Sequence, residues 1–172
     1  MKSTIGSRAI TSEDTNSARG KRKFLVVIDD TPECEHALLY AARRAKRTGA
    51  TVLALVVAPP TEFQHWLNVE NLMREEAEEE ANEMLDRSFA KLSKHGAEEP
   101  ERRIVFGNRT DGIREVIGDD HSIAVLVLAA AAGAEGPGPL VSAIASGQAG
   151  TYPVPITIVP GGLTPEEIDA IT

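Results

Sequence analysis

The sequence is poor in cysteine, in aromatic residues and in long apolar runs, and each shortage excludes a class of protein. Cys34 is the single cysteine among 172 residues, so no internal disulfide can form and nothing marks an oxidising compartment. The longest apolar run, residues 123–132, is far shorter than the roughly 18 residues of a membrane span. Residues 1–23 lack the apolar core of a secretory signal. We therefore expect a cytoplasmic protein with no membrane partner.

Positive charge is scarce outside the first 23 residues. That segment holds six lysines and arginines and two acidic residues, which leaves −12 on the remainder of a chain whose total charge is −8. Such an acidic body repels nucleic-acid phosphates, so no nucleic-acid partner is expected. Residues 1–22 are also rich in small polar residues, and we expect them to form a flexible basic arm. A domain over residues 23–160 and a short helix within residues 161–172 should follow.

Apolar residues make up 42% of the chain, enough for the core of one globular domain. They gather in five short runs, and between these runs apolar residues recur every three or four positions, as in amphipathic helices. This alternation predicts an α/β fold, a five-stranded parallel sheet with helices on both faces. The predicted strands are residues 24–28, 51–57, 103–106, 123–128 and 154–159.

Local signals indicate where the helices begin and end. Thr31 before Pro32 is expected to N-cap the first helix, and Gly49 to end it. A long helix should run from Thr61 towards Gly96, with a glutamate-rich face turned to solvent. The other expected helices are residues 109–117, a helix from Pro139 to about Gly150, and a short terminal helix N-capped by Thr164.

Candidate chemistry is limited. Ligands of such sheets bind at the carboxyl ends of the strands, which makes Asp29 a candidate, although aspartate is also favoured as a turn cap there. Cys34 is expected to be a small, partly buried side chain rather than a redox sensor. The four histidines are scattered and predict no metal site. Ser142 lacks the G-x-S-x-G elbow of a hydrolase nucleophile, so serine hydrolase chemistry is excluded.

The strands and strand ends resemble those of the universal stress protein family. The likeness rests on residues 28–33, the strand end at residues 55–57, Gly107 and residues 152–159, and it covers roughly residues 22–160. It implies a Rossmann-like fold similar to the adenine nucleotide α-hydrolases and a usually dimeric, cytoplasmic protein of the stress response. The family has an ATP-binding class and a class that binds no nucleotide.

The resemblance also implies positions for the nucleotide-binding residues. Asp29 matches an aspartate after the first strand, and Val56 matches a second-strand valine; both hold the nucleoside in the ATP-binding class. The family's phosphate pattern, G-x2-G-x9-G-[ST], has lost all its glycines, because its places are held here by Ala129, Ala132, Ser142 and Ala143. A Cβ at these positions hinders the close approach of backbone N–H groups to phosphate.

The loop that follows the fourth strand still contains glycine. Gly133 and Gly136, with the N–H groups behind Pro139, could still form an anion site. Glu135 would oppose a phosphate there, and no lysine or arginine lies nearby in the sequence. We therefore expect a degraded phosphate motif and a non-catalytic protein. The alternative is an ATP-binding member that senses or slowly hydrolyses nucleotide with Mg²⁺.

An enzyme of the wider α-hydrolase superfamily is disfavoured. Those enzymes carry a serine- and glycine-rich loop after the first strand, and residues 29–32 contain no glycine and no run of hydroxyls. Binding to a second copy, or to an unidentified protein partner, is the remaining function. Alternation in the last strand predicts an edge for a homodimer, formed by Val154, Ile156 and Ile158. The alternative is a monomer whose edge is covered by residues 164–172.

Overall fold

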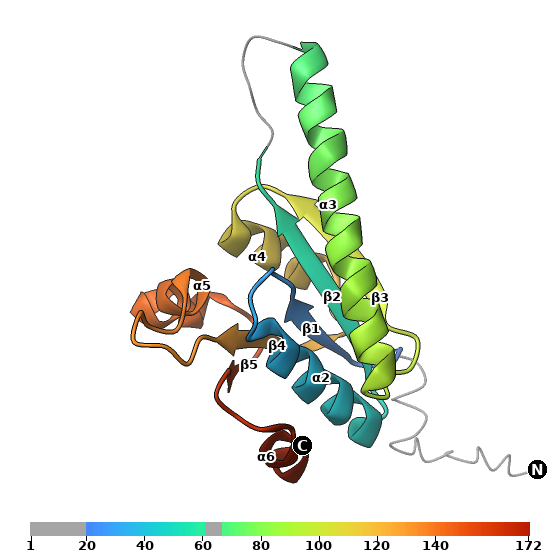
Figure 1. Cartoon of the computed structure of the whole chain (residues 1–172), viewed down its shortest axis with the longest axis vertical. Helices are drawn as coiled ribbons and strands as arrows, with labels where there is room; N and C mark the ends of the chain where they lie inside the picture. The colour runs from blue at the N-terminus through green and yellow to red at the C-terminus, as the bar shows by residue number, and fades with distance from the viewer. Residues whose placement is uncertain (1–19, 61–66) are drawn as a thin grey trace, which may run out of the picture.

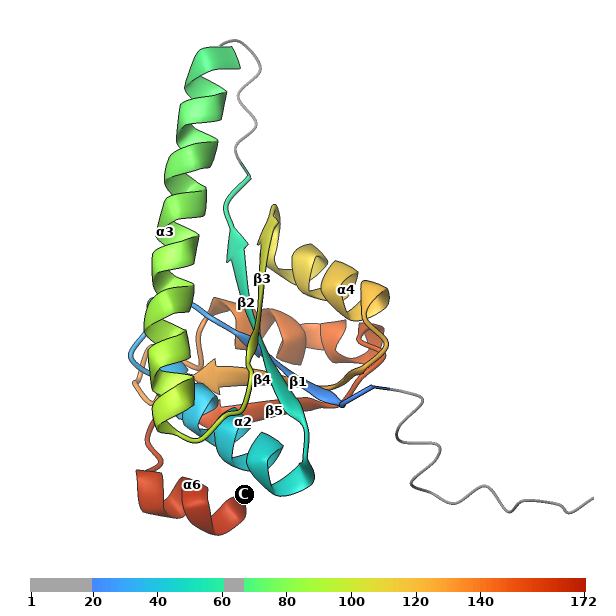
Figure 2. The same ribbon diagram turned by 90° about the vertical axis from the view of Figure 1, so that its right-hand side faces the viewer.

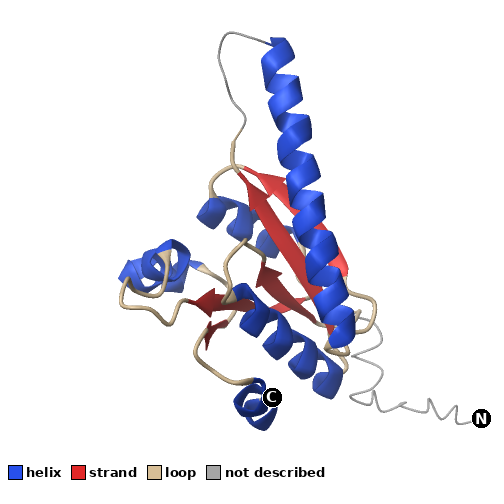
Figure 3. Ribbon diagram, viewed as in Figure 1, coloured by secondary structure: helices blue, strands red, loops and turns tan. Residues whose placement is uncertain are grey.

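The computed structural model describes residues 20–60 and 67–172. Most of the predicted arm and the predicted helix start at Thr61 lie outside these residues and stay predictions. Five parallel strands form one sheet in the order β3-β2-β1-β4-β5 (Figures 1 and 3). The predicted α/β fold is therefore confirmed. The strands are β1 (Lys23–Val27), β2 (Thr51–Ala58), β3 (Glu101–Phe106), β4 (Ile123–Ala130) and β5 (Ile156–Pro160).

Helices cover both faces of the sheet (Figure 1). Helices α2 and α3 pack on one face, and α4 and α5 pack on the other. Strand order reverses between β1 and β4, the position at which sheets of this type bind ligands. The helices are α2 (Cys34–Thr48), α3 (Leu67–Lys94), α4 (Arg109–Asp119), α5 (Pro139–Ala143) and α6 (Pro165–Ile171).

The central strand β1 contributes to two separate cores because side chains alternate between the faces of a strand. Val26 packs with the residues of α2 and α3, while Leu25 packs with those of α4 and α5. Both side chains are fully buried. This double burial explains why β1 is a continuous apolar run instead of an alternating one.

The first helix begins later than the sequence indicates. Helix α2 starts at Cys34, and the predicted N-cap at Thr31 is wrong. The Thr31 hydroxyl instead donates a 2.6 Å hydrogen bond to Asp29 Oδ1, within the turn that follows β1. The predicted helix end is confirmed, since Gly49 is left-handed at φ 67°.

The helix predicted from Pro139 to about Gly150 is broken. Helix α5 has five residues and is followed by a π-helical turn (Ile144–Gln148) and a 3-10 turn (Ala149–Thr151). Gly147 interrupts the path with φ 123°, a value that glycine adopts without strain. The chain then reaches β5 at Ile156, so the predicted start of that strand at Val154 is wrong.

Helix α3 is longer than the sheet that it covers. Ala81, Leu85 and Leu92 are buried against the sheet, whereas Leu72 and Met73 are exposed. Figures 1 and 2 both show the amino-terminal half extending past the sheet. The predicted solvent-facing glutamates are exposed, and they are Glu75, Glu76, Glu78, Glu79, Glu80 and Glu83.

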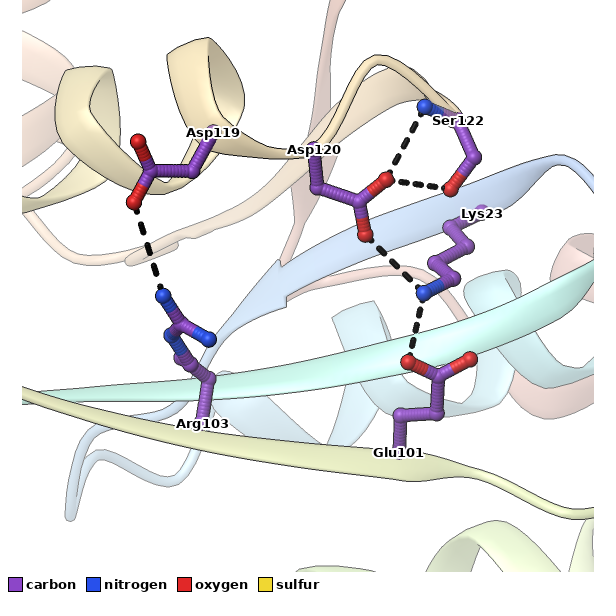
Figure 4. A network of polar contacts seen from close by, with 6 residues as sticks. All are labelled: Lys23, Glu101, Arg103, Asp119, Asp120 and Ser122. Atoms are coloured by element: carbon purple, nitrogen blue, oxygen red, sulfur yellow. Dashed lines mark hydrogen bonds and ion pairs between the residues drawn. The ribbon is translucent and has the colours of Figure 1, made fainter.

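A polar network joins the amino ends of β1 and β3 to the turn before β4 (Figure 4). Lys23 Nζ, at the start of β1, donates to Glu101 at the start of β3 and, over 2.9 Å, to Asp120 Oδ2 before β4. Asp120 Oδ1 also accepts a 2.9 Å hydrogen bond from the Ser122 backbone N–H. These contacts fasten the end of the sheet opposite to the one where ligands of such folds bind.

Candidate functional site

A cavity of about 340 Å³ lies at the carboxyl ends of β1 and β4. It is at the reversal of strand order, and its volume falls at the lower end of the roughly 300–1,000 Å³ of small-molecule sites. Its walls are the loop after β1, the end of β4, the segment 137–141 that enters α5, and Arg109 at the start of α4. A larger hollow of about 720 Å³ lies at the other end of the sheet, around Gly20 and Thr48, away from this edge.

Asp29 holds the turn after β1 and also faces the cavity. Its Oδ1 accepts hydrogen bonds from the Thr31 hydroxyl and, over 3.3 Å, from the Thr31 backbone N–H. The predicted role of Asp29 as a turn cap is thereby confirmed. Its Oδ2 lies 3.9 Å from Arg109 Nη1, so the same carboxylate has a cationic neighbour across the cavity.

Arg109 is the residue that sequence reasoning missed. The Asn108 side chain caps α4 by accepting from the Thr110 N–H at 3.0 Å and the Asp111 N–H at 3.3 Å. This cap fixes Arg109 as the first residue of α4, from which its side chain reaches Asp29. A signal was available, because Arg109 stands only two residues after Gly107, the predicted end of the third strand.

The loop after β4 approaches the cavity through two glycines with positive φ. Gly136 has φ 94° and Gly138 has φ 95°, and the Ala131 N–H donates to the Pro137 carbonyl over 3.4 Å. This path places residues 137–141 on the cavity wall. The α5 helix that follows has only five residues, so its amino end offers far fewer aligned peptide dipoles than a full-length helix.

The residues predicted from the family's nucleotide pattern are only partly brought together. Asp29 and Ala129 line the cavity. Val56 is instead buried in the core beneath α2 and α3. The remaining predicted residues lie outside the cavity lining: Ala132, Gly133, Gly136, Ser142 and Ala143. Their roles in nucleotide binding stay predictions.

The polar lining of the cavity carries more negative than positive charge. Three carboxylates, Asp29, Asp30 and Glu33, line it together with one guanidinium, that of Arg109. Asp30 is largely exposed, and its Oδ1 lies 3.8 Å from Arg87 of α3, outside the cavity. The exposed Glu135 in the neighbouring loop adds to the negative charge of this edge. The site therefore suits a neutral or weakly anionic ligand better than a highly charged one.

Cys34 lies at the start of α2, beneath the loop that borders the cavity. Its side chain is buried, and its Sγ is 3.9 Å from the Val27 carbonyl oxygen. Burial raises the pKa of the thiol to about 11, which outweighs the hydrogen bond from the Asp29 backbone that would lower it. The predicted role as a small side chain within the fold is confirmed, and the side chain is buried more deeply than the partial burial that was predicted.

Metal sites and membrane-spanning helices are two further features to consider among the described residues. Within residues 20–60 and 67–172, no group of three or more His, Cys, Asp and Glu side chains is placed to hold a metal ion. Over the same residues, no helix combines the length and apolar character needed to cross a bilayer.

Comparison with known proteins decides the family. The model of the universal stress protein family matches residues 21–160. The chain belongs to the universal stress protein family. The predicted resemblance is thus confirmed, and α6 lies beyond the matched residues. No curated protein matches the sequence.

Solved structures of universal stress proteins share the fold at low sequence identity. UspA from Lactobacillus plantarum is 19% identical with a TM-score of 0.65, over 80% of this chain and 97% of that one. An Archaeoglobus fulgidus universal stress protein in complex with dAMP is 17% identical, TM-score 0.57, over 82% and 98%. A universal stress protein in complex with cAMP is 17% identical, TM-score 0.58, over 82% and 98%. At these identities the likeness shows the fold alone.

Proposed function

We propose that this member of the universal stress protein family is a non-catalytic cytoplasmic protein that acts by binding and by pairing with a second copy, and that its cavity does not hold ATP. The observation that carries the proposal is the charge of the cavity lining, three carboxylates against one guanidinium. The guanidinium of Arg109 already lies beside Asp29, which offsets part of its charge.

The repulsion between a triphosphate and the carboxylates of the cavity can be estimated. Two like charges 4 Å apart repel by about 1 kcal/mol in bulk water and by about 4 kcal/mol at the effective dielectric constant of a protein surface. A triphosphate seated beside Asp29 and Glu33 would meet several such repulsions. The chain lacks the glycine cradle that would offset them, since Ala129 stands where the family pattern begins with glycine.

Nucleotide binding with Mg²⁺ is the second candidate, and specific observations favour it. Two structures with the same fold are complexes with cAMP and with dAMP, nucleotides that carry a single phosphate. Arg109 supplies one guanidinium in the cavity, a match for one phosphate rather than three. A nucleoside monophosphate is therefore the form of this candidate that the charge of the site supports best.

Calorimetric and thermal-shift titrations with ATP and Mg²⁺, cAMP, dAMP and adenosine separate the two candidates. Under the leading proposal, millimolar ATP with Mg²⁺ leaves the unfolding temperature unchanged. A ligand present at a hundred times its Kd would stabilise the protein by about 2.7 kcal/mol, which is easily measured. Binding of ATP that Arg109→Gln abolishes and Arg103→Gln preserves would overturn the proposal. Arg103 is a matched control because it pairs with Asp119, away from the cavity.

The exposed edge of β5 supports pairing with a second copy. Among the described strands β5 pairs only with β4, and Ile158 is 41% exposed. Helix α6 packs against α2, with Asp169 beside Arg43, so the alternative in which α6 covers the edge gains no support. Ile156 is half-buried, which leaves Ile158 as the main apolar contact for a partner strand.

Light scattering on purified protein tests this pairing. The unaltered chain should be a dimer, and Ile158→Lys should convert it to a monomer by placing charges against each other at the edge. Leu72→Lys is the matched control, since Leu72 is equally apolar and 55% exposed on α3. A monomeric unaltered chain at micromolar concentration would refute the dimer.

A further inference from the structure

A second cavity, of about 300 Å³, lies between α2, the end of α3 and the start of α6. It shares no lining residue with the cavity at the carboxyl ends of the strands. The family match ends at residue 160, so the wall formed by α6 lies outside the matched residues. The residues that line this second cavity are Pro32, Glu35, His36, Leu39, Arg43, His95 and Pro165.

Hydrogen bonds and a buried side chain hold helix α6 against α2, so this wall of the cavity is fixed. Ile168 of α6 is fully buried. Arg44 and Arg47 of α2 donate hydrogen bonds of 3.1 and 3.2 Å to the carbonyls of Thr172 and Asp169. A capping box fixes its start, since the Glu167 N–H donates to Thr164 Oγ1 and the Thr164 N–H to Glu167 Oε2.

The two histidines of the cavity hold nitrogens without a partner. His36 Nδ1 and His95 Nε2 are buried and make no hydrogen bond to the described residues. Buried polar atoms are nearly always paired in folded proteins, so each such atom requires an explanation. The charged neighbours are already engaged. Glu35 Oε2 lies 3.1 Å from Lys91 Nζ, and Arg43 Nε lies 2.8 Å from Asp169 Oδ1, although without hydrogen-bond alignment.

We propose that this cavity binds a small organic acid with an apolar body. The carboxylate is received by the remaining N–H groups of Arg43 and by His36 and His95, whose buried, unpaired nitrogens reach the ligand when each ring turns about its Cβ–Cγ bond; all are donors when the imidazoles are protonated. The apolar body rests on Leu39, Pro32 and Pro165. Water occupies about 30 Å³ per molecule in the liquid, so the cavity has the room of roughly ten waters, which suits a single ring bearing a carboxylate.

The surroundings of His95 link this binding to protonation. Burial lowers the pKa of His95, Glu35 opposes that shift, and Arg43, Lys94 and Lys91 add to it. A carboxylate bound beside the ring would favour its protonated form. Binding therefore takes up a proton, and the affinity rises as the pH falls from 8 to 6. On α6, the Asp169 carboxylate lies beside Arg43 and adds a negative charge to the wall that α6 forms.

Calorimetric titration of the full chain with benzoate tests the proposal, with benzamide as the uncharged analogue of the same shape. Benzoate should bind several-fold more tightly at pH 6 than at pH 8, and the measured heat should depend on the ionisation enthalpy of the buffer. Benzamide should bind at least about ten-fold more weakly, because its neutral amide forms no ion pair with Arg43 or with the protonated histidines. Failure of benzoate to bind, or equal binding of benzamide, would overturn the proposal.

Substitutions in the lining test whether benzoate binds in this cavity. His95→Gln and Arg43→Gln should each weaken benzoate binding about ten-fold, and His95→Gln should also reduce its pH dependence. His121→Gln is the matched control, since His121 is exposed in the turn before β4. If a variant fails to fold, the NMR signals of the histidine ring protons in the unaltered protein show where benzoate binds. Benzoate should shift those of His36 and His95 and leave that of His121 in place, and the reverse would refute the site.

Discussion

Arg109 Nη1 lies 3.9 Å from Asp29 Oδ2, so the first residue of α4 and the turn after β1 meet across the candidate cavity. Both side chains keep contact with water, at 44% and 27% exposure. Asp29 is held by Thr31 whether or not Arg109 is present. The pair therefore sets the charge that a ligand meets more than it sets the stability of the fold.

Replacing Arg109 should accordingly have little effect on stability. Exposed ion pairs contribute about 0–1 kcal/mol, so Arg109→Gln is expected to lower the free energy of unfolding by less than about 1 kcal/mol. Urea unfolding followed by circular dichroism measures the change. A loss above about 2 kcal/mol would show that Arg109 holds the loop in place, contrary to the geometry of the Asp29 turn.

Replacing Lys23 is expected to lower the stability of the fold more than replacing Arg109. The Lys23 side chain is 17% exposed and bridges Glu101 and Asp120, so Lys23→Met leaves two carboxylates near each other without their shared cation. We expect a loss of about 1–3 kcal/mol in the free energy of unfolding. Lys21→Met, at an exposed position two residues earlier, should stay within about 0.5 kcal/mol. Equal effects of the two substitutions in urea unfolding would contradict the network in Figure 4.

The same network predicts a dependence on pH. Burial alone would raise the pKa of Asp120, but hydrogen bonds from Ser122 and Lys23 outweigh it and hold the pKa below its ordinary value of 3.8. A carboxyl with a lowered pKa in the folded state stabilises the fold above its unfolded pKa and loses that effect as the pH falls through the folded value. The difference in unfolding free energy between the unaltered chain and Lys23→Met should therefore shrink between pH 5 and pH 2. A difference that stays constant over this range would exclude the linkage.

Cys34 should be unreactive in the folded protein. With a pKa of about 11 and a buried Sγ, almost no thiolate is available at neutral pH. Alkylation by iodoacetamide should be at least ten-fold slower than in denaturant. The double variant Cys34→Ser with Glu35→Cys is a matched control, because the Glu35 side chain is 52% exposed on the same helix and a thiol there should react readily. Equal rates for the two thiols would show that the amino end of α2 opens.

Features set by neighbouring residues could be predicted from the sequence. Thr164, Pro165 and Glu167 carry the whole capping box of α6 within four residues, and the structure confirms each part. The apolar run of β1 likewise predicts a central strand, because only a strand covered on both faces needs apolar residues at every position.

Features set by the path of the chain through space could not be predicted in this way. Arg109 and Asp29 meet because β3 and β1 end at the same edge of the sheet with only β2 between them, an order of strands that the sequence does not give. The break after α5 could not be predicted, because Gly147 has φ 123° and a single glycine in a sequence does not show that the chain turns there. The contact of α6 with α2 depends on Arg44 and Arg47, whose place near the end of α2 indicates only cations that suit the helix dipole.

The projection of α3 past the sheet has a consequence for local opening. At 1.5 Å per residue its 28 residues span about 42 Å, yet among the side chains described from residue 71 onward deep burial begins only at Ala81. Ahead of that point, contacts such as Arg74 over the Phe106 ring at 5.0 Å replace a packed core. Fraying of these turns costs little free energy and leaves the sheet intact. Their backbone amides should therefore exchange with deuterium well before those of the segment that follows Ala81.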